Sequence, residues 1–281
     1  MSGLGELSRP ATVLIEKVSD AIGGVFKPYQ IVRVAKAEAE ADKVRAKAEI
    51  DVTDLQRRAF HRFLEEEAKK QANIEDITRK ALPHLSNEAK PEAIEKDWLS
   101  HFFDKSRLIS DEAMQDIWSK VLAGEANVPG SFSKRTINFL SSLDKTDAEL
   151  FTALRKFCCV IEGDLVPLVF DALDPLYHRA GIGFTTLLHL ESIGLIQFNS
   201  DRGFARAKLS KKVVLAYFDT EMELAMPKDT DNDLEVGQVL LTQIGVELVQ
   251  LVQIEPDNQF MEYLRGRLTA FSPTIRPPQA S

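Results

Sequence analysis

Cysteine is scarce in this chain: of 281 residues only Cys158 and Cys159 are cysteines, and they are adjacent. Neighbouring cysteines rarely bridge to each other, so a disulfide framework is excluded, and so is a cysteine-rich zinc site. This usage fits a reducing compartment, and we expect a cytoplasmic protein. Both thiols are expected to be buried in an apolar helix, away from the base or helix N-terminus that a reactive thiolate needs.

Long apolar runs and catalytic motifs are also missing. No stretch reaches the roughly 18 apolar residues of a membrane span, and residues 1–10 lack the pattern of a signal peptide. The sequence contains no G-x-S-x-G, no phosphate loop, no G-x-G-x-x-G and no H-E-x-x-H. We therefore predict no catalytic residue, no cofactor and a non-enzymatic protein.

One cluster resembles a metal site without completing it. Asp171, Asp174 and His178 have helical spacing that could place three ligands on one face. Pro175 lies among them and disturbs that geometry. No metal ligand is predicted.

Residues 1–28 are predicted to hold a short amphipathic helix, which Pro28 stops. Two interpretations stay open: the helix packs on its own protein or a sister subunit, or it lies on a membrane surface. Membrane-surface helices favour Lys and Arg on the polar face, and this helix offers a single Lys17, which favours packing. The side chains proposed for partner or membrane contact are Val13, Leu14, Val18, Ile22, Val25 and Phe26.

Residues 29–83 are predicted to form one long charged helix. Between Gln30 and Leu82 the chain has 12 basic and 11 acidic residues and no Gly or Pro, which is typical of a solvated helix. Its heptad seam consists of small residues and is interrupted by an aspartate, so a freestanding zipper is not favoured. We expect a spacer or assembly element with this seam: Val34, Ala37, Ala41, Val44, Ala48, Asp51 and Leu55.

Residues 84–162 are predicted to be a helical core domain. After a first helix, a second begins at an N-cap, Ser110, and ends at Gly124, before a Pro-Gly loop. A later helix begins with a capping box of Thr146 and Glu149, and its apolar stripe consists of Phe151, Leu154, Cys158 and Ile161.

Residues 163–272 are predicted to be a winged-helix-like α+β domain. The stretch 164–180 looks like helical pieces interrupted by prolines. A helix closed by Gly194 precedes a two-stranded wing with Gly203 at its turn, which is the winged-helix outline. Residues 273–281 are predicted to be a disordered tail.

This outline raises the question of DNA binding. The helix in the recognition position has no Arg or Lys for base edges, and residues 181–270 hold 13 acidic against 8 basic residues. The whole chain carries a net charge of −8, which also disfavours nucleic acid. A nucleic-acid-binding regulator therefore stays the alternative function, with phosphate contacts from Arg202, Arg206, Lys208, Lys211 and Lys212.

Two segments carry a family resemblance: IEKVSDAIGGVFKPYQIVRVAKAEAEADKVRA and DEAMQDIWSKVLAGEANVPGSFSKRTINFLSSLD. They resemble a bacterial and prophage-associated family, the domain of unknown function number 2806. The chain is also similar to abortive-infection alpha proteins in Ile117-Trp118, Pro129-Gly130-Ser131 and Gly194-Leu195-Ile196. The resemblance implies no catalytic residues, and it implies anti-phage defence by analogy.

We thus expect a mainly α protein with a smaller α+β part: a long N-terminal helix, a central helical bundle and a C-terminal winged-helix-like region. The expected function is that of a non-enzymatic bacterial assembly or interaction protein in phage defence. Its expected partners are further copies of the chain or another protein, with peripheral contact to the inner membrane as a further option.

Overall fold

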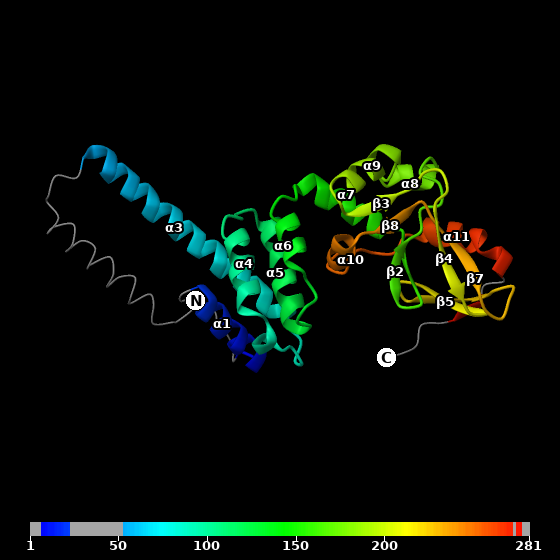
Figure 1. Ribbon diagram of the computed structural model, residues 1–281, viewed down its shortest axis with the longest axis horizontal. Helices are drawn as coiled ribbons and strands as arrows, with labels where there is room; N and C mark the ends of the chain where they lie inside the picture. The colour runs from blue at the N-terminus through cyan, green and yellow to red at the C-terminus, as the bar shows by residue number, and fades with distance from the viewer. Residues whose placement is uncertain (1–6, 23–52, 272–273, 277–281) are drawn as a thin grey trace. The chain divides into compact units, whose positions relative to one another are not determined.

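The computed structural model describes residues 7–22, 53–271 and 274–276. The chain divides into two compact units, residues 1–141 and 142–281 (Figure 1). The first unit is helical and the second combines helices with antiparallel strands, so the prediction of an α-rich chain with a smaller sheet part is confirmed. Residues 142–162, which were predicted to belong to the helical core, lie in the second unit.

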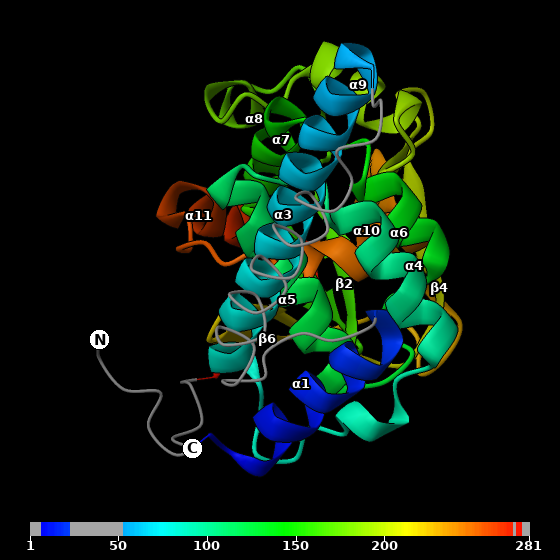
Figure 2. The same ribbon diagram turned by 90° about the vertical axis from the view of Figure 1, so that its left-hand side faces the viewer.

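In the first unit, helices of very different length pack on one another. The longest described helix, α3, runs alongside α5, and α1 lies beside α4 (Figure 2). The elements are α1 (Arg9–Ile22), α3 (Asp54–Ala81), η1 (Leu82–His84), η2 (Pro91–Ala93), α4 (Lys96–Ser106), α5 (Glu112–Asn127) and α6 (Lys134–Leu140).

The core of the first unit is aromatic. Phe102 stacks on Trp98 with ring centroids 5.1 Å apart, and it meets the rings of Phe103 and Trp118 edge-on. All four side chains are buried. Offset and edge-on aromatic pairs each stabilise by roughly 0.5–1.5 kcal/mol beyond the area that they bury.

The loop after α5 is held by buried polar groups. The Glu125 carboxylate accepts hydrogen bonds from the backbone N–H of Gly130 at 2.7 Å and of Phe132 at 3.0 Å. The indole N–H of Trp98 donates to the carbonyl of Phe132 at 2.7 Å. These bonds place the Phe132 ring against Gly124, where an added Cβ would lie 2.7 Å from a ring carbon.

Helix boundaries in the first unit differ from the predicted ones. The N-cap of α5 is Asp111 and not Ser110, because the Asp111 side chain accepts from the N–H of Met114. Gly124 does not end α5, which continues to Asn127. Its lack of a side chain serves the close approach of Phe132 and not a C-terminal cap.

In the second unit, short helices surround three antiparallel sheets with the strand orders β2-β1-β5-β6-β9, β3-β8 and β4-β7. The helices are α7 (Lys145–Arg155), α8 (Pro175–Arg179), α9 (Phe184–Ser192), α10 (Gln243–Val249), α11 (Asn258–Arg267) and η3 (Thr269–Phe271). The strands are β1 (Cys158–Ile161), β2 (Asp164–Pro167), β3 (Ile196–Phe198), β4 (Phe204–Leu209), β5 (Lys212–Tyr217), β6 (Thr220–Ala225), β7 (Asn232–Gly237), β8 (Val239–Leu241) and β9 (Thr274–Arg276).

Two tyrosines anchor the core of this unit through their hydroxyl groups. Tyr217 donates to the carbonyl of Lys156 and accepts from the N–H of Asp257, each at 2.8 Å. Tyr177 donates to the carbonyl of Leu168 at 2.8 Å. Because the rings are buried while their hydroxyls are bonded, they add apolar area without leaving a polar atom unpaired.

The two cysteines lie on a strand, so the prediction of a helix there is wrong. Helix α7 ends at Arg155, and Cys158–Ile161 pairs with Asp164–Pro167 as a hairpin. Glu162 and Gly163, at φ 50° and 89°, form a two-residue turn of the kind that matches strand twist. The cap of α7 also differs, since Asp144 and not Thr146 is its N-cap.

The predicted wing is wrong in its pairing. Strand β3 pairs with β8, and β4 pairs with β7, so β3 and β4 are not partners of each other. The N–H of Asn199 donates to the carbonyl of Gln238 at 2.9 Å, so the turn at Gly203 is a bend within a longer ribbon. The paired residues lie 23 to 45 positions apart in the sequence, which a local turn signal cannot reveal.

The C-terminal tail is likewise not wholly without structure. Residues 274–276 form β9, which pairs with β6 through Glu221–Arg276, Met222–Ile275 and Glu223–Thr274 in register. A sheet edge offers free backbone groups to any extended segment, including one too short to predict from its own sequence.

We predict that Gly124→Ala destabilises the first unit by about 1–3 kcal/mol, because the new methyl group forces the Phe132 ring out of a close-packed site. Both tryptophans lie in this unit, so urea unfolding followed by tryptophan fluorescence measures the effect. Gly266→Ala is the control: its Cβ meets nothing within 4 Å, and circular dichroism should show unchanged or slightly higher stability. Equal stability of Gly124→Ala and the wild type would contradict the packing argument.

Candidate interaction surface

Helix α3 has a sharply defined start. The Thr53 side chain accepts from the N–H of Gln56, and the Gln56 side chain accepts from the N–H of Thr53 at 3.0 Å. This capping box means that the chain enters α3 from a non-helical residue, Thr53, at ψ 151°. The prediction of one uninterrupted helix over residues 29–83 is therefore wrong at Thr53, and residues 29–52 lie outside the described part.

The C-terminal half of α3 packs against α5. Its buried residues recur at helical spacing, and Ile77, Thr78 and Ala81 have no exposed surface. The hydroxyl of Thr78 donates to the carbonyl of Ile74 at 2.8 Å, so this buried polar atom is paired within the helix.

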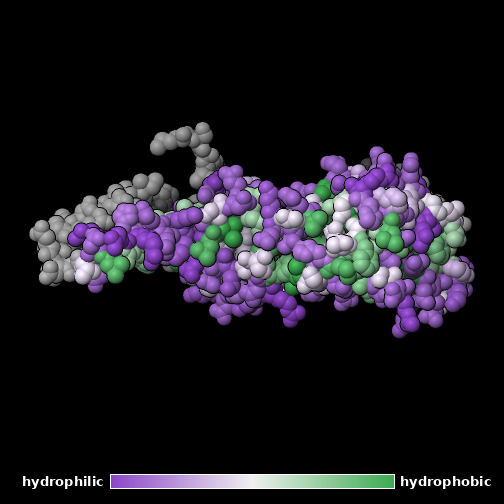
Figure 3. Space-filling view, turned by 90° about the horizontal axis from the view of Figure 1, so that it is seen from above, coloured by the Kyte–Doolittle hydropathy of each residue, from purple (hydrophilic) through white to green (hydrophobic). Residues whose placement is uncertain are grey.

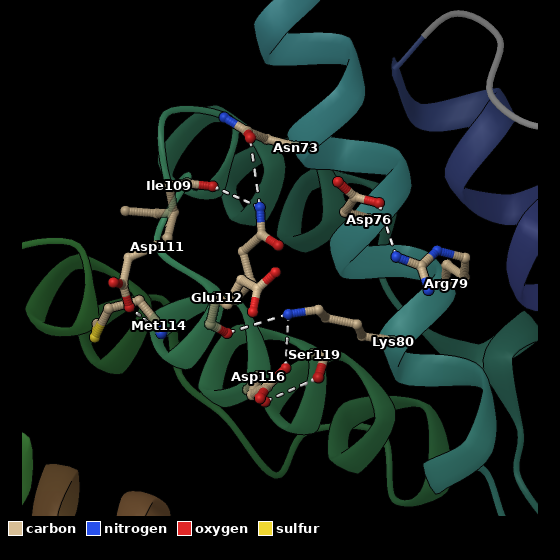
Figure 4. Close-up of polar contacts among 11 residues, drawn as sticks. Asn73, Asp76, Arg79, Lys80, Ile109, Asp111, Glu112, Met114, Asp116 and Ser119 are labelled. Atoms are coloured by element: carbon tan, nitrogen blue, oxygen red, sulfur yellow. Dashed lines mark hydrogen bonds and ion pairs between the residues drawn. The ribbon is translucent and has the colours of Figure 1, made fainter.

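Polar contacts fix the same half near both of its ends (Figure 4). The buried Asn73 side chain donates to the carbonyl of Arg107 at 2.8 Å, and the Gln115 amide donates to the carbonyl of Ile109 and to Asn73. Further along, the Lys80 ammonium bonds Asp116 at 2.8 Å and the carbonyl of Glu112. Leaving a buried amide unpaired costs roughly 1–3 kcal/mol, so these contacts hold α3 in one register on α5.

The N-terminal half of α3 has no packing at all in the described part. Every residue from Thr53 to Lys69 is exposed. Large apolar side chains nevertheless occur there, and Figure 3 shows a hydrophobic patch among hydrophilic side chains on this half, at the left of the view. The exposed α3 stripe consists of Leu55 (68% exposed), Phe60 (53%), Phe63 (55%) and Leu64 (38%).

The exposed stripe continues the buried face of the same helix. Phe60 precedes Thr78 by 18 residues, and Phe63 precedes Ala81 by the same interval, which is about five helical turns. Thr78 and Ala81 are fully buried, whereas the two phenylalanines are more than half exposed. One helix face thus packs inside the unit at one end and meets solvent at the other.

The sequence analysis found this surface only in part. Of its heptad seam only Leu55 lies in the described residues, and the other six positions cannot be compared. It missed Phe60, Phe63 and Leu64, although their i, i+3, i+4 spacing is the ordinary signal of a helix face that becomes buried.

The apolar residues predicted on the N-terminal helix are partly used within the chain. Leu14 and Val18 of α1 are fully buried where the helix lies against η2 and α4. Val13 and Ile22 are half-buried, and Val25 and Phe26 lie outside the described residues. Lys17 donates to the carbonyl of Ile94 at 3.3 Å, which ties the polar side of α1 to the same unit.

Three of the five basic residues predicted for phosphate contact form ion pairs. Arg206 pairs with Asp164, Lys211 with Asp229 at 2.6 Å, and Lys212 with Glu223 at 2.9 Å. Arg202 lies in the bend before β4, and Lys208 on β4 has a positive φ of 61°. The side chains of Lys211 and Lys212 stay more than half exposed, so these pairs are weak and the phosphate contacts stay a prediction.

The candidate metal ligands serve as turn and cap residues. The Asp171 carboxylate accepts from the N–H of Leu173, and that of Asp174 accepts from the N–H of Leu176 to cap α8. Within the residues that the structure describes, no group of three or more His, Cys, Asp or Glu side chains could hold a metal ion. Nor does any helix in those residues combine the length and apolarity needed to cross a membrane.

The two thiols are unsuited to nucleophilic chemistry. Burial raises the pKa of Cys158 to about 12, although Arg155 acts in the opposite direction. Burial and the neighbouring Cys158 raise the pKa of Cys159. Thiolate, the reactive form, is therefore strongly disfavoured in the folded protein.

These features define an α-rich protein of two units whose candidate site is a helix face and not a cleft. Residues 57–265 match a family described as Protein of unknown function (DUF2806), and the chain belongs to this family. The match includes the exposed α3 stripe from Phe60 onward and extends through most of the second unit. No curated protein and no solved structure matches the chain.

We predict that Cys158 and Cys159 react with a thiol reagent such as DTNB at pH 8 at least ~1,000-fold more slowly in the folded protein than in urea. The raised pKa lowers the thiolate fraction tenfold per unit, and burial blocks the reagent. The measurement is the rise in absorbance at about 412 nm as the reagent releases its own thiolate, roughly two equivalents per chain when both cysteines react. Rapid reaction of the folded protein would show that one of the thiols is accessible.

Proposed function

We propose that this chain is a non-enzymatic assembly protein that docks another protein surface on the exposed α3 stripe. The observation that carries the proposal is the exposure of Phe60 and Phe63 on a helix face that is fully buried five turns further on. The setting that we propose is phage defence, which rests on the resemblance to abortive-infection proteins.

The energetics of α3 support an occupant for the stripe. A helix half of about 17 residues without packing is marginal in water, since most helical stability in proteins comes from burying one face. Burying a Phe or Leu side chain fully is worth roughly 1.5–3 kcal/mol, so the four partly exposed side chains offer several kcal/mol to association. Scattered single apolar residues need no explanation, but a contiguous stripe marks an interaction site.

The alternative of a nucleic-acid regulator has less support. Three of the five candidate phosphate contacts already pair with carboxylates, and the second unit is acidic. Nucleic-acid affinity depends on free Lys and Arg that displace counterions from phosphates. Assembly through apolar contact needs no such charge.

We predict that Phe60→Gln with Phe63→Gln weakens assembly about 100- to 1,000-fold, because at least two partly buried rings per interface lose their apolar contact. Gln has a slightly higher helix propensity than Phe, so α3 itself persists. Sedimentation velocity over a 100-fold range, roughly 1 to 100 μM, measures the association constant.

The matched control is Leu108→Gln, which removes an equally exposed apolar side chain from the same unit outside α3. It should assemble as the wild type does. A wild type that stays monomeric throughout the range, or a double variant that assembles unchanged, would overturn the proposed function. Circular dichroism checks that every variant retains its helix content.

A further inference from the structure

We infer that the occupant of the exposed α3 stripe is the same stripe of a second copy, running antiparallel across a twofold axis near Phe63. This inference rests on the proposed function and names its partner and geometry. The apolar residues of the stripe concentrate near that point, since Phe60, Phe63 and Leu64 lie within about one turn of it.

The order of charges along the exposed half is the main argument. Between residues 57 and 67 the basic residues come first and the acidic residues follow, and all six are exposed: Arg57, Arg58 and Arg62, then Glu65, Glu66 and Glu67. Asp54 before this segment and Lys69 after it are also exposed, and at about 100° per residue they lie on the side of the helix opposite the stripe. A segment with this order of charges is electrostatically complementary to a second copy that runs in the opposite direction. Two copies that run antiparallel place the basic turn of each opposite the acidic turn of the other.

The helical positions of these charges fit a twofold axis. At about 100° per residue, Arg57 and Glu67 lie toward the Leu64 side of the stripe, and Arg62 and Glu66 lie toward the Leu55 side. A twofold axis perpendicular to two antiparallel helices brings like sides together. With Phe63 on the axis, Arg57 lies within about 3 Å, along the helix, of Glu67 of the second copy.

A parallel pair would have the opposite electrostatics. It places Arg57, Arg58 and Arg62 against themselves, and the three glutamates against themselves, which is unfavourable at close range. Among the described residues these charges pair within the helix, as Arg62 does with Glu66 at 3.4 Å, where both side chains are more than half exposed. Such pairs are weak, so they exchange readily for pairs between copies.

Disulfide trapping tests the orientation. The native thiols are buried, so introduced cysteines are the reactive ones. In the antiparallel pair, mixing Arg57→Cys with Glu67→Cys chains should give a covalent dimer under mild oxidation. Each variant alone should not cross-link, because its two cysteines lie about 12–18 Å apart along the helices. Cross-linking of each variant with itself, and not with the other, would overturn the inference.

Charge reversal is a second and independent measurement. The variant Arg57→Glu with Arg62→Glu, and the variant Glu66→Arg with Glu67→Arg, should each dimerise at least tenfold more weakly at low salt. An equimolar mixture of the two, or a chain carrying all four changes, should recover dimerisation. Dimers that no reversal weakens would contradict the charge argument.

The results of these experiments distinguish failure of the antiparallel pair from failure of the proposed assembly function. Assembly that Phe60→Gln with Phe63→Gln disrupts, but that has parallel cross-links or a mass other than two copies, overturns only the antiparallel pair. Assembly that ignores the phenylalanines overturns the proposed function as well. A monomer whose stripe is protected from hydroxyl-radical labelling would assign the stripe to residues 23–52 of the same chain and overturn both.

Discussion

The packing of the C-terminal half of α3 on α5 is the contact on which the first unit depends. It buries Ile77, Thr78 and Ala81, and the Asn73–Gln115 contact fixes the register between the two helices. Because α3 is one continuous helix of 28 residues, that docking also decides where its other half extends. The exposed stripe thus follows from the packing of the core, because one face of the helix is buried in the C-terminal half and exposed in the N-terminal half.

Several polar residues in the described part of the chain have structural roles. Glu125 holds the loop before α6 through two backbone N–H groups, and Asp174 caps α8. Tyr217 joins the end of α7 to the start of α11. A carboxylate or hydroxyl that satisfies buried backbone groups is not free to bind a substrate, and its removal would leave those groups unpaired. Other described carboxylates likewise serve in turns and ion pairs, such as Asp171 and Asp116.

Local sequence patterns predicted the main helices, whereas the strands were predicted poorly because their pairing is non-local. The apolar faces around Trp98 and Trp118 recur at 3.6-residue spacing, so α4 and α5 were found to within a few residues. The cysteine strand was mistaken for a helix because four apolar residues fit either periodicity. Its hairpin turn at Glu162–Gly163 was the missed signal. The prediction of a two-stranded wing failed because the hydrogen bonds between β4 and β7 join residues that are not neighbours in the sequence.

The sequence by itself determined the α-rich composition, the helix periodicities, the family and the charge order along α3. These properties depend on residues that are close together in the sequence and interact within one or two turns of helix. Only the tertiary structure decided which face of α3 is buried and where burial stops. Phe63 and Ala81 occupy equivalent positions on that face, and nothing local distinguishes a position that faces α5 from one that extends beyond it. Burial of a residue depends on which other segments pack against it, and the tertiary fold determines those segments.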